Sequence, residues 1–365
     1  MSEPPFRADQ VGSLLRSDAL KQARERHAGG ELADAAFRAI EDREIEKLIG
    51  KQEEIGLRVA TDGEYRRAVW SLDFLEHLDG VESYRREGVQ FKGVKATPKA
   101  ARVVGKIGFG GHPMLDDFRF LKEHTRVTPK MTIPAPAVLH FRIGDGIDRK
   151  VYPDDAEFFD DLGKAYRETV QAFYDAGCRY LQFDDTVWAY LCSADEGEKA
   201  RGRGLDPERL PETYAKVINA AIKGRPADLK MTTHVCRGNF RSSWISEGGY
   251  EPVAEVLLGA LDYDGYFLEY DTDRAGGFEP LRFVPKGQKR VVLGLITSKT
   301  GALEEKDAIK RRIDEAATFA DLEQLCLSPQ CGFASTEEGN MLTEEEQWAK
   351  LRLIVEIAGE VWGST

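Results

Sequence analysis

Short apolar runs rich in branched side chains recur along the chain, and longer segments with one apolar face separate most of them. Such alternation is typical of strand and helix units on a parallel sheet. It predicts eight strands, which cover Arg7–Ser13, Arg58–Glu64, Lys130–Pro136, Arg179–Asp185, Lys230–Cys236, Tyr266–Asp271, Arg290–Thr297 and Leu325–Cys331. It predicts helices over Glu31–Ile55, Ala156–Ala176, Pro207–Lys223, Glu251–Leu261, Leu303–Phe319 and Thr343–Val361. Eight strands with helices between them indicate an α/β fold, a (β/α)8 TIM barrel.

Polar and small residues mark several ends of the predicted helices. Asp206-Pro207 and Thr343, which precedes three glutamates, are typical of helix starts. Gly177 and Gly224 are typical of helix ends.

The alternation breaks between about residues 81 and 128, where many glycines and two short β-like runs occur without a good helical face. We interpret this segment as an insertion after the second strand. It is expected to form either a hairpin or lid over the catalytic end or an ornament at the edge without a role. Because no linker or repeat divides the chain, we expect residues 1–365 to form a single domain.

Composition limits the classes of partner and the cellular location that we expect for this protein. The formal net charge is −12 and the pI is near 5.2, which argues against a nucleic-acid partner. The amino terminus lacks the apolar segment of a signal peptide, and no apolar run is long enough to cross a membrane, so we expect a cytoplasmic protein. Five irregularly spaced cysteines argue against a disulfide framework and predict reduced thiols that are available to a metal.

Chemically active side chains gather where the predicted strands end, which is where such barrels build their active sites. His234 and Cys236 lie two residues apart on the fifth strand, so both face the same side. Cys331 closes the eighth strand, and Glu269 lies on the sixth. Zinc is the ion that most often takes nitrogen and thiolate together.

The sequence therefore predicts a zinc site with three ligands, His234, Cys236 and Cys331, and with Glu269 as the fourth or a displaceable ligand. Two thiolates leave little net charge on the metal, which favours activation of a thiol over activation of water. Each residue taken alone also has an alternative, purely structural interpretation. Cys236 would be a core cysteine, Cys331 a small residue before a turn, and Glu269 a partner in a salt bridge.

From Gly12-Ser13 through Cys331-Gly332 the sequence resembles the catalytic barrel of cobalamin-independent methionine synthase. The resemblance implies an enzyme of methionine biosynthesis that transfers a methyl group from methyltetrahydrofolate to homocysteine on a zinc ion. It also implies the zinc ligands, which are His234, Cys236, Glu269 and Cys331.

The resemblance further implies a homocysteine pocket built from Gly12, Ser13, Glu64 and Asp184. Two carboxylates suit an α-ammonium group, while a serine hydroxyl and backbone amides suit a carboxylate. The alternative for the two carboxylates is pairing with nearby arginines, namely Arg66, Arg67 or Arg237.

Three departures from the family concern the methyl donor. The chain has one predicted barrel, Tyr190 stands where the family has a folate-binding glutamate, and Lys299 lies where it has a histidine proton donor. We predict that Lys299, together with Asp184, belongs to the catalytic residues: the lysine would protonate a leaving group or hold an anion. The alternative is a solvated loop lysine.

Our first hypothesis is a zinc-dependent S-methyltransferase that forms methionine from homocysteine, with methyltetrahydrofolate or another donor. A second is a zinc-dependent alkyltransferase of the epoxyalkane:coenzyme M transferase type, in which arginines would bind the sulfonate, namely Arg66, Arg67, Arg237 or Arg241. A third is a barrel that binds a thiol or zinc without catalysis. Each predicts small-molecule partners, and a homo-oligomer is compatible with all three.

Overall fold

The computed structural model describes residues 3–85, 89–91, 94–96, 99–143 and 146–365. Its strands are β1 (Val59–Ala60), β2 (Asp79–Arg85), β3 (Val89–Phe91), β4 (Val94–Ala96), β5 (Lys99–Gly108), β6 (Thr128–Pro129), β7 (Met131–Pro134), β8 (Tyr180–Asp185), β9 (Lys230–Val235), β10 (Gly265–Glu269), β11 (Arg290–Ile296) and β12 (Leu325–Pro329). Its α-helices are α1 (Asp18–Ala28), α2 (Asp34–Glu54), α3 (Leu72–Leu75), α4 (Met114–His124), α5 (Pro136–Ile143), α6 (Asp155–Asp175), α7 (Val187–Leu191), α8 (Ala194–Gly202), α9 (Leu210–Ile222), α10 (Glu251–Ala254), α11 (Lys306–Ala316) and α12 (Glu344–Trp362).

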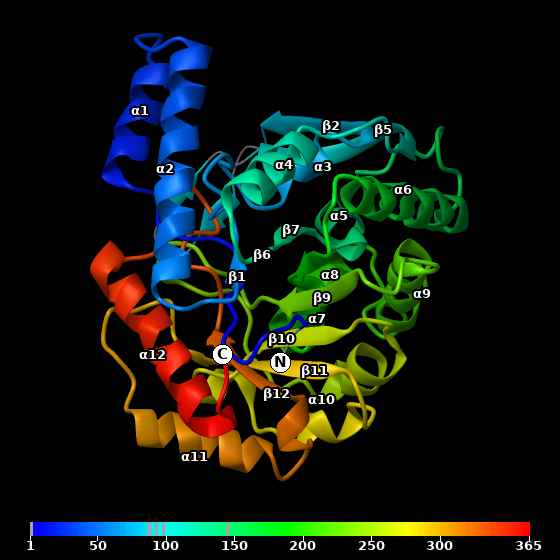
Figure 1. Cartoon of the computed structure of the whole chain (residues 1–365). Helices are drawn as coiled ribbons and strands as arrows, with labels where there is room; N and C mark the ends of the chain where they lie inside the picture. The colour runs from blue at the N-terminus through cyan, green and yellow to red at the C-terminus, as the bar shows by residue number, and fades with distance from the viewer. Residues whose placement is uncertain (1–2, 86–88, 92–93, 97–98, 144–145) are drawn as a thin grey trace.

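The central sheet is parallel and follows the order of the chain. Six strands from β7 to β12 pair in sequence, and β1 pairs in parallel with β6, which lies one residue before β7. The first predicted strand closes the ring: Asp9 N donates to Leu327 O of β12 at 3.0 Å, and Leu14 N donates to Gly63 O at 3.1 Å. Figure 1 shows these strands at the centre with α6, α9, α11 and α12 around them, so the (β/α)8 barrel is confirmed.

The first predicted strand, Arg7–Ser13, is nevertheless not a regular strand, because it forms a single bridge between Ala8 and Leu327. Its later carbonyls accept from side chains inside the barrel. Lys130 Nζ donates to Gln10 O at 2.6 Å, and Gln182 Nε2 donates to Val11 O at 2.8 Å. These carbonyls are therefore satisfied without a ladder.

The predicted helices recur with small shifts at their ends, and helices α1, α3, α4, α5, α7 and α8 add to them. Thr343 starts α12 with a capping box, as predicted, while Asp206-Pro207 does not start α9, which begins at Leu210. Gly177 and Gly224 follow α6 and α9 with positive φ, as helix ends require. The predicted helix Glu251–Leu261 divides into α10 and a π-helix, η1 (Glu255–Ala260). Short 3-10 turns occur as η2 (Asp273–Ala275), η3 (Glu279–Phe283) and η4 (Leu322–Gln324).

The segment predicted as an insertion contains antiparallel pairs β2–β5 and β3–β4, and then helix α4. The expectation of no helical face was wrong, because Met114, Phe118 and Leu121 form the buried face of α4. Residues 86–88, 92–93 and 97–98 of this segment lie outside the described residues. Strand β5 packs on α6, and none of the described residues between 81 and 128 lines the cavity that holds the candidate site.

Across the described part of the chain, no helix combines the length and apolarity needed to cross a membrane.

Gly294 on β11 lies where the backbone of this strand passes close to the backbone of two neighbouring segments. A Cβ at this position would lie 2.7 Å from Gln330 Cα and 2.9 Å from Leu268 O, and neither backbone atom can move without disturbing the barrel. We expect Gly294→Ala to destabilise the protein by about 1–3 kcal/mol in urea unfolding. The matched control is Gly359→Ala in α12, where a Cβ meets nothing within 4 Å, so it should stabilise by about 0.5–1 kcal/mol. Equal unfolding midpoints for the two variants would contradict this packing argument.

Candidate metal and thiol site

The carboxyl ends of the parallel strands bring the predicted metal ligands together. His234 lies near the end of β9, Cys236 follows that strand directly, and Glu269 ends β10. Cys331 follows β12 by two residues. All four side chains are buried. The fold thus places residues that are far apart in sequence at one end of the barrel.

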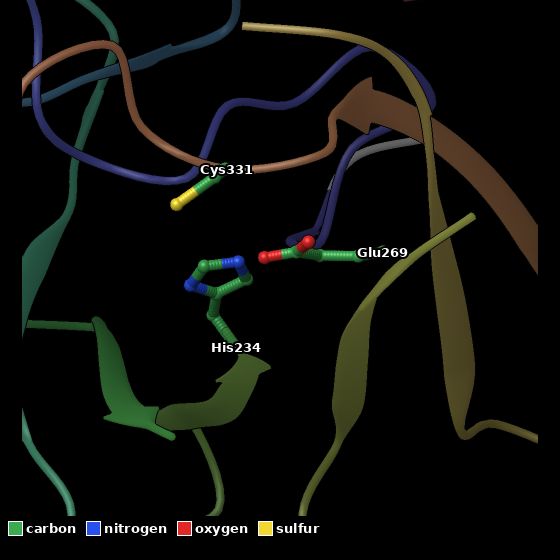
Figure 2. A group of neighbouring side chains, drawn as sticks. All are labelled: His234, Glu269 and Cys331. Carbon is green, nitrogen blue, oxygen red and sulfur yellow. The ribbon is translucent and has the colours of Figure 1, made fainter. Parts of the chain in front are cut away.

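Three of the four predicted ligands lie close enough together to share a metal ion, and Cys236 lies beside Cys331 without being part of that group of three. The ligand atoms of His234, Glu269 and Cys331 lie within 4.8 Å of one another, and Figure 2 shows the three side chains pointing toward a common centre. Cys236 Sγ lies 3.6 Å from Cys331 Sγ. Two sulfurs bound to one zinc through bonds of about 2.3 Å would lie ~3.8 Å apart. One nitrogen, two sulfurs and one carboxylate are all zinc ligands.

Charge in the cluster is unevenly shared. A hydrogen bond from Cys236, followed by contacts with His234, lowers the pKa of Cys331 well below its usual value despite burial. The same sulfur pair raises the pKa of Cys236 well above its usual value. Burial opposes a charge on His234, but hydrogen bonds with Asp184 and Cys331 raise its pKa to about 10. The sulfur of Cys331 is therefore the preferred thiolate.

Glu269 is tethered through one oxygen only. Arg237 N donates to Glu269 Oε1 at 2.9 Å, and this amide belongs to the residue that follows Cys236. Within the described residues Glu269 Oε2 accepts no hydrogen bond, although Arg274 Nη2 lies 3.7 Å away. Burial raises the pKa of Glu269 to about 7. A buried carboxylate with one oxygen that accepts no described hydrogen bond, close to the sulfur of Cys331, is suited to bind a metal cation.

Two further carboxylates, Glu64 and Asp184, lie beside the cluster. Glu64 Oε1 accepts from Thr132 Oγ1 at 2.9 Å and lies 3.6 Å from an Arg67 nitrogen, so the predicted alternative of arginine pairing holds for this oxygen. Glu64 Oε2 has no hydrogen-bond partner among the described residues. Asp184 Oδ1 accepts from Gln182 and lies 3.6 Å from His234 Nδ1. One buried carboxylate oxygen is thus open to an ammonium group.

The backbone of Glu64 is strained. Its φ is +59°, in the left-handed region that favours glycine, and its N–H donates to Asp62 Oδ1 at 2.9 Å. This conformation turns the side chain back toward the barrel. Burial raises the pKa of Glu64 to about 7, with Arg67 opposing and Asp184 reinforcing the shift.

Two glycines leave room for this arrangement. A Cβ on Gly332 would lie 2.0 Å from Ser13 Oγ, and a Cβ on Gly12 would lie 2.7 Å from Thr132 Cγ2. Ser13 is buried, and its hydroxyl accepts from Ala334 N at 3.4 Å. Because the hydroxyl accepts this bond, its proton is free to be donated to a ligand.

A cavity of about 740 Å³ joins these groups. Its inner wall comprises Ser13, Glu64, Asp184, His234, Cys236 and Cys331. Its outer wall is aromatic and includes Trp70, Phe141, Tyr190 and Phe240. Three cationic side chains, Arg142, Lys199 and Arg203, also contribute to the lining. Apart from Tyr190, the outer residues were missed, because they come from short helices and loops whose positions no strand pattern predicts.

The arginines predicted to bind a sulfonate lie elsewhere. None of Arg66, Arg67, Arg237 and Arg241 lines the cavity. Arg66 instead forms ion pairs with Asp42 and Asp117, and Arg237 is fully buried with its guanidinium over the ring of Tyr250.

Lys299 is buried, so the alternative of a solvated loop lysine was wrong. It does not line the cavity either. Its Nζ contacts Gly238 O, Asn239 Oδ1 and Ser243 O at 3.3, 3.1 and 3.5 Å. Asn239, which the sequence analysis missed, follows the His-x-Cys motif by three residues, and this position was its only sequence signal.

Comparison with known proteins connects the chain to one family. Residues 6–360 match the family described as "Cobalamin-independent synthase, Catalytic domain". The chain is 55% identical to the Bacillus subtilis "Uncharacterized protein YxjH" over 98% of its own length and 95% of that protein. A methionine synthase from Sulfurisphaera tokodaii is 23% identical over 88% of this chain and 84% of that protein.

Solved structures agree. A crystal structure of a candidate vitamin-B12 independent methionine synthase from Listeria monocytogenes shares 46% identity with a TM-score of 0.82, and all of both chains is covered. A B12-independent methionine synthase from Shewanella, in complex with selenomethionine, has the same fold at 19% identity, with a TM-score of 0.74 over 98% of this chain and 97% of that one. Because the family match spans nearly the whole chain, this protein belongs to the cobalamin-independent methionine synthase family.

Proposed function

We propose that this protein is a zinc-dependent methyltransferase that methylates the thiol of homocysteine to methionine within one catalytic domain. The observation that carries the proposal is the cluster of one nitrogen, one carboxylate and two sulfurs beside a pair of buried carboxylates in a single cavity. Methionine synthases among the relatives and a neighbour crystallised with selenomethionine support the same conclusion.

The ligands proposed for zinc are His234, Cys236, Glu269 and Cys331. Bound zinc would lower the pKa of a substrate thiol, so that a nucleophilic thiolate persists at neutral pH. Glu269 is the ligand we expect to exchange for the substrate, because the hydrogen bond from Arg237 N would hold its carboxylate in place away from the metal.

The amino-acid end of homocysteine is proposed to bind to the same inner wall, beside the metal ligands. Its ammonium group is proposed to lie between Glu64 Oε2, which has no described partner, and Asp184. Its carboxylate is proposed to accept from the hydroxyl of Ser13. These contacts would direct the sulfur toward the cysteines and leave the methyl donor on the aromatic side of the cavity, beside Tyr190.

The donor is methyltetrahydrofolate or another methyl compound. The chain is 21% identical to a 5-methyltetrahydropteroyltriglutamate–homocysteine methyltransferase of Thermotoga petrophila, but it spans only 41% of that protein. At position 190 the cavity lining presents a tyrosine where the family is expected to have a folate-binding glutamate. The arginines predicted to bind a sulfonated thiol lie outside the cavity lining, but Arg142, Lys199 and Arg203 line it, so the affinities for a sulfonated thiol and for homocysteine have to be compared directly.

We expect metal analysis to find about one zinc per chain and calorimetry to show that the zinc form binds homocysteine. Product analysis should then detect methionine when methyl donors are supplied one by one. Failure of the zinc form to bind homocysteine would contradict the proposed function, as would binding of a sulfonated thiol in its place. Homocysteine binding without turnover on every donor tested would favour a barrel that only binds the thiol.

A further inference from the structure

Resting on this proposed function, we propose that Lys299 is a positioning residue that fixes the spacing of the two cysteine-bearing loops. Lys299 follows β11 and lies beneath the loop that continues from Cys236. Its ammonium contacts two backbone carbonyls of that loop, Gly238 O at 3.3 Å and Ser243 O at 3.5 Å. These contacts hold both the beginning and the turn of the loop.

Asn239 extends the connection to the second cysteine. Lys299 Nζ donates to Asn239 Oδ1 at 3.1 Å, and Asn239 Nδ2 donates to Gly332 O at 2.7 Å. Gly332 directly follows Cys331. The side chain of Asn239 therefore connects the loop after Cys236 to the loop after Cys331. Movement of either loop would break a buried hydrogen bond, which is costly.

The ammonium has no donor left for a substrate. A lysine carries three N–H groups, and three oxygens of the loop lie within hydrogen-bonding distance of Nζ. The side chain is buried and lies outside the cavity lining. This geometry is suited to a lysine that holds the loop in place. It does not bring the ammonium group to the reacting atoms, where a proton donor would have to be.

The loop itself needs such a support. Arg241 and Ser242 have φ of +46° and +65°, in a region that side chains rarely adopt. Such conformations persist only where the surroundings hold them. Lys299 contacts the oxygen of Ser243, the next residue, and Asn340 Oδ1 accepts from Ser242 N at 3.1 Å. Removal of the ammonium should therefore let the loop relax and move Cys236.

The test compares Lys299→Met and Asn239→Ala, which break the same connection with and without loss of a charge. Zinc affinity is measured by competition with a chromophoric chelator, and ligand geometry by the visible absorption of the Co²⁺-substituted protein. We expect both variants to bind zinc about 10- to 100-fold more weakly and to show a changed Co²⁺ spectrum. The matched control is Lys350→Met, since Lys350 is also buried but donates to Ala302 O and Glu304, and no bond is described between it and either cysteine-bearing loop.

Wild-type zinc affinity and a wild-type Co²⁺ spectrum in both variants would overturn the inference. So would Lys299→Met with unchanged metal binding and a lower kcat, which is the behaviour of a proton donor. If Lys299→Met does not fold, Asn239→Ala decides by the same two measurements. Zinc affinity and the Co²⁺ spectrum do not depend on turnover. If the wild-type protein binds zinc but transfers no methyl group, the proposed function is contradicted and this test can still be read.

Discussion

Replacement of Cys331 by serine is expected to remove most of the zinc and reduce methyl transfer by more than about 100-fold, because loss of a ligand should exceed the ~10- to 100-fold cost of losing a residue behind one. Cys331 is one of the two sulfurs in the proposed ligand set, and the hydrogen bond from Cys236 holds its pKa well below its usual value. A serine hydroxyl stays protonated at neutral pH and is a poor zinc ligand. Metal content by atomic emission and methionine formation measure the two effects.

The matched control is Cys178→Ser, at a second buried cysteine. Cys178 Sγ donates to Tyr180 O at 3.3 Å, and a serine hydroxyl can make the same bond. This variant should keep its zinc and its activity. A Cys331→Ser protein with full zinc and full activity would show that the metal site is elsewhere.

Glu64→Gln is expected to weaken the binding of methionine by about 10- to 100-fold, since a hydrogen bond to a charged group contributes roughly 1.5–3 kcal/mol. Glutamine keeps the shape of Glu64 and removes the charge that faces the ammonium. Methionine is the better probe because it lacks a thiol, so its affinity, measured by calorimetry, does not report thiol ionisation. Glu41→Gln, at a buried carboxylate that pairs with Arg66 outside the cavity, should bind methionine normally.

The same pocket predicts the pH dependence of this affinity. Burial raises the pKa of Glu64 to about 7, so below that pH its carboxyl is largely neutral and cannot balance an ammonium charge. Methionine affinity should therefore rise as pH increases through about 7, and the Glu64→Gln variant should lose this rise. A wild-type affinity that is flat across this range would place the ammonium elsewhere.

Sequence patterns predicted the inner strands well, because buried parallel strands are continuous apolar runs. The predicted Arg179–Asp185 and Arg290–Thr297 differ from β8 and β11 by one residue each. The irregular backbone of Arg7–Ser13 could not be predicted from its own sequence. The side chains that donate hydrogen bonds to its carbonyls belong to Lys130 and Gln182, which lie far along the chain.

Two of the missed helices, α1 and α4, illustrate different physical reasons. Helix α1 is highly charged and buries only Leu20 and Ala23, so its apolar periodicity is weak. Helix α4 does carry apolar residues at helical spacing, and the glycines and proline before it obscured them. The burial of Lys299 depends on how a distant loop folds over it, which no local pattern encodes.

The left-handed backbone of Glu64 puts folding and ligand binding in conflict at one position. Glycine would adopt a φ of +59° without strain, whereas a residue with a side chain pays about 1–3 kcal/mol there. Stability alone thus favours the loss of the carboxylate that the proposed pocket requires. Replacement of Glu64 by glycine would therefore be expected to raise the stability of the fold and to abolish recognition of the amino acid. Substitutions that raise the melting temperature should be chosen away from this turn.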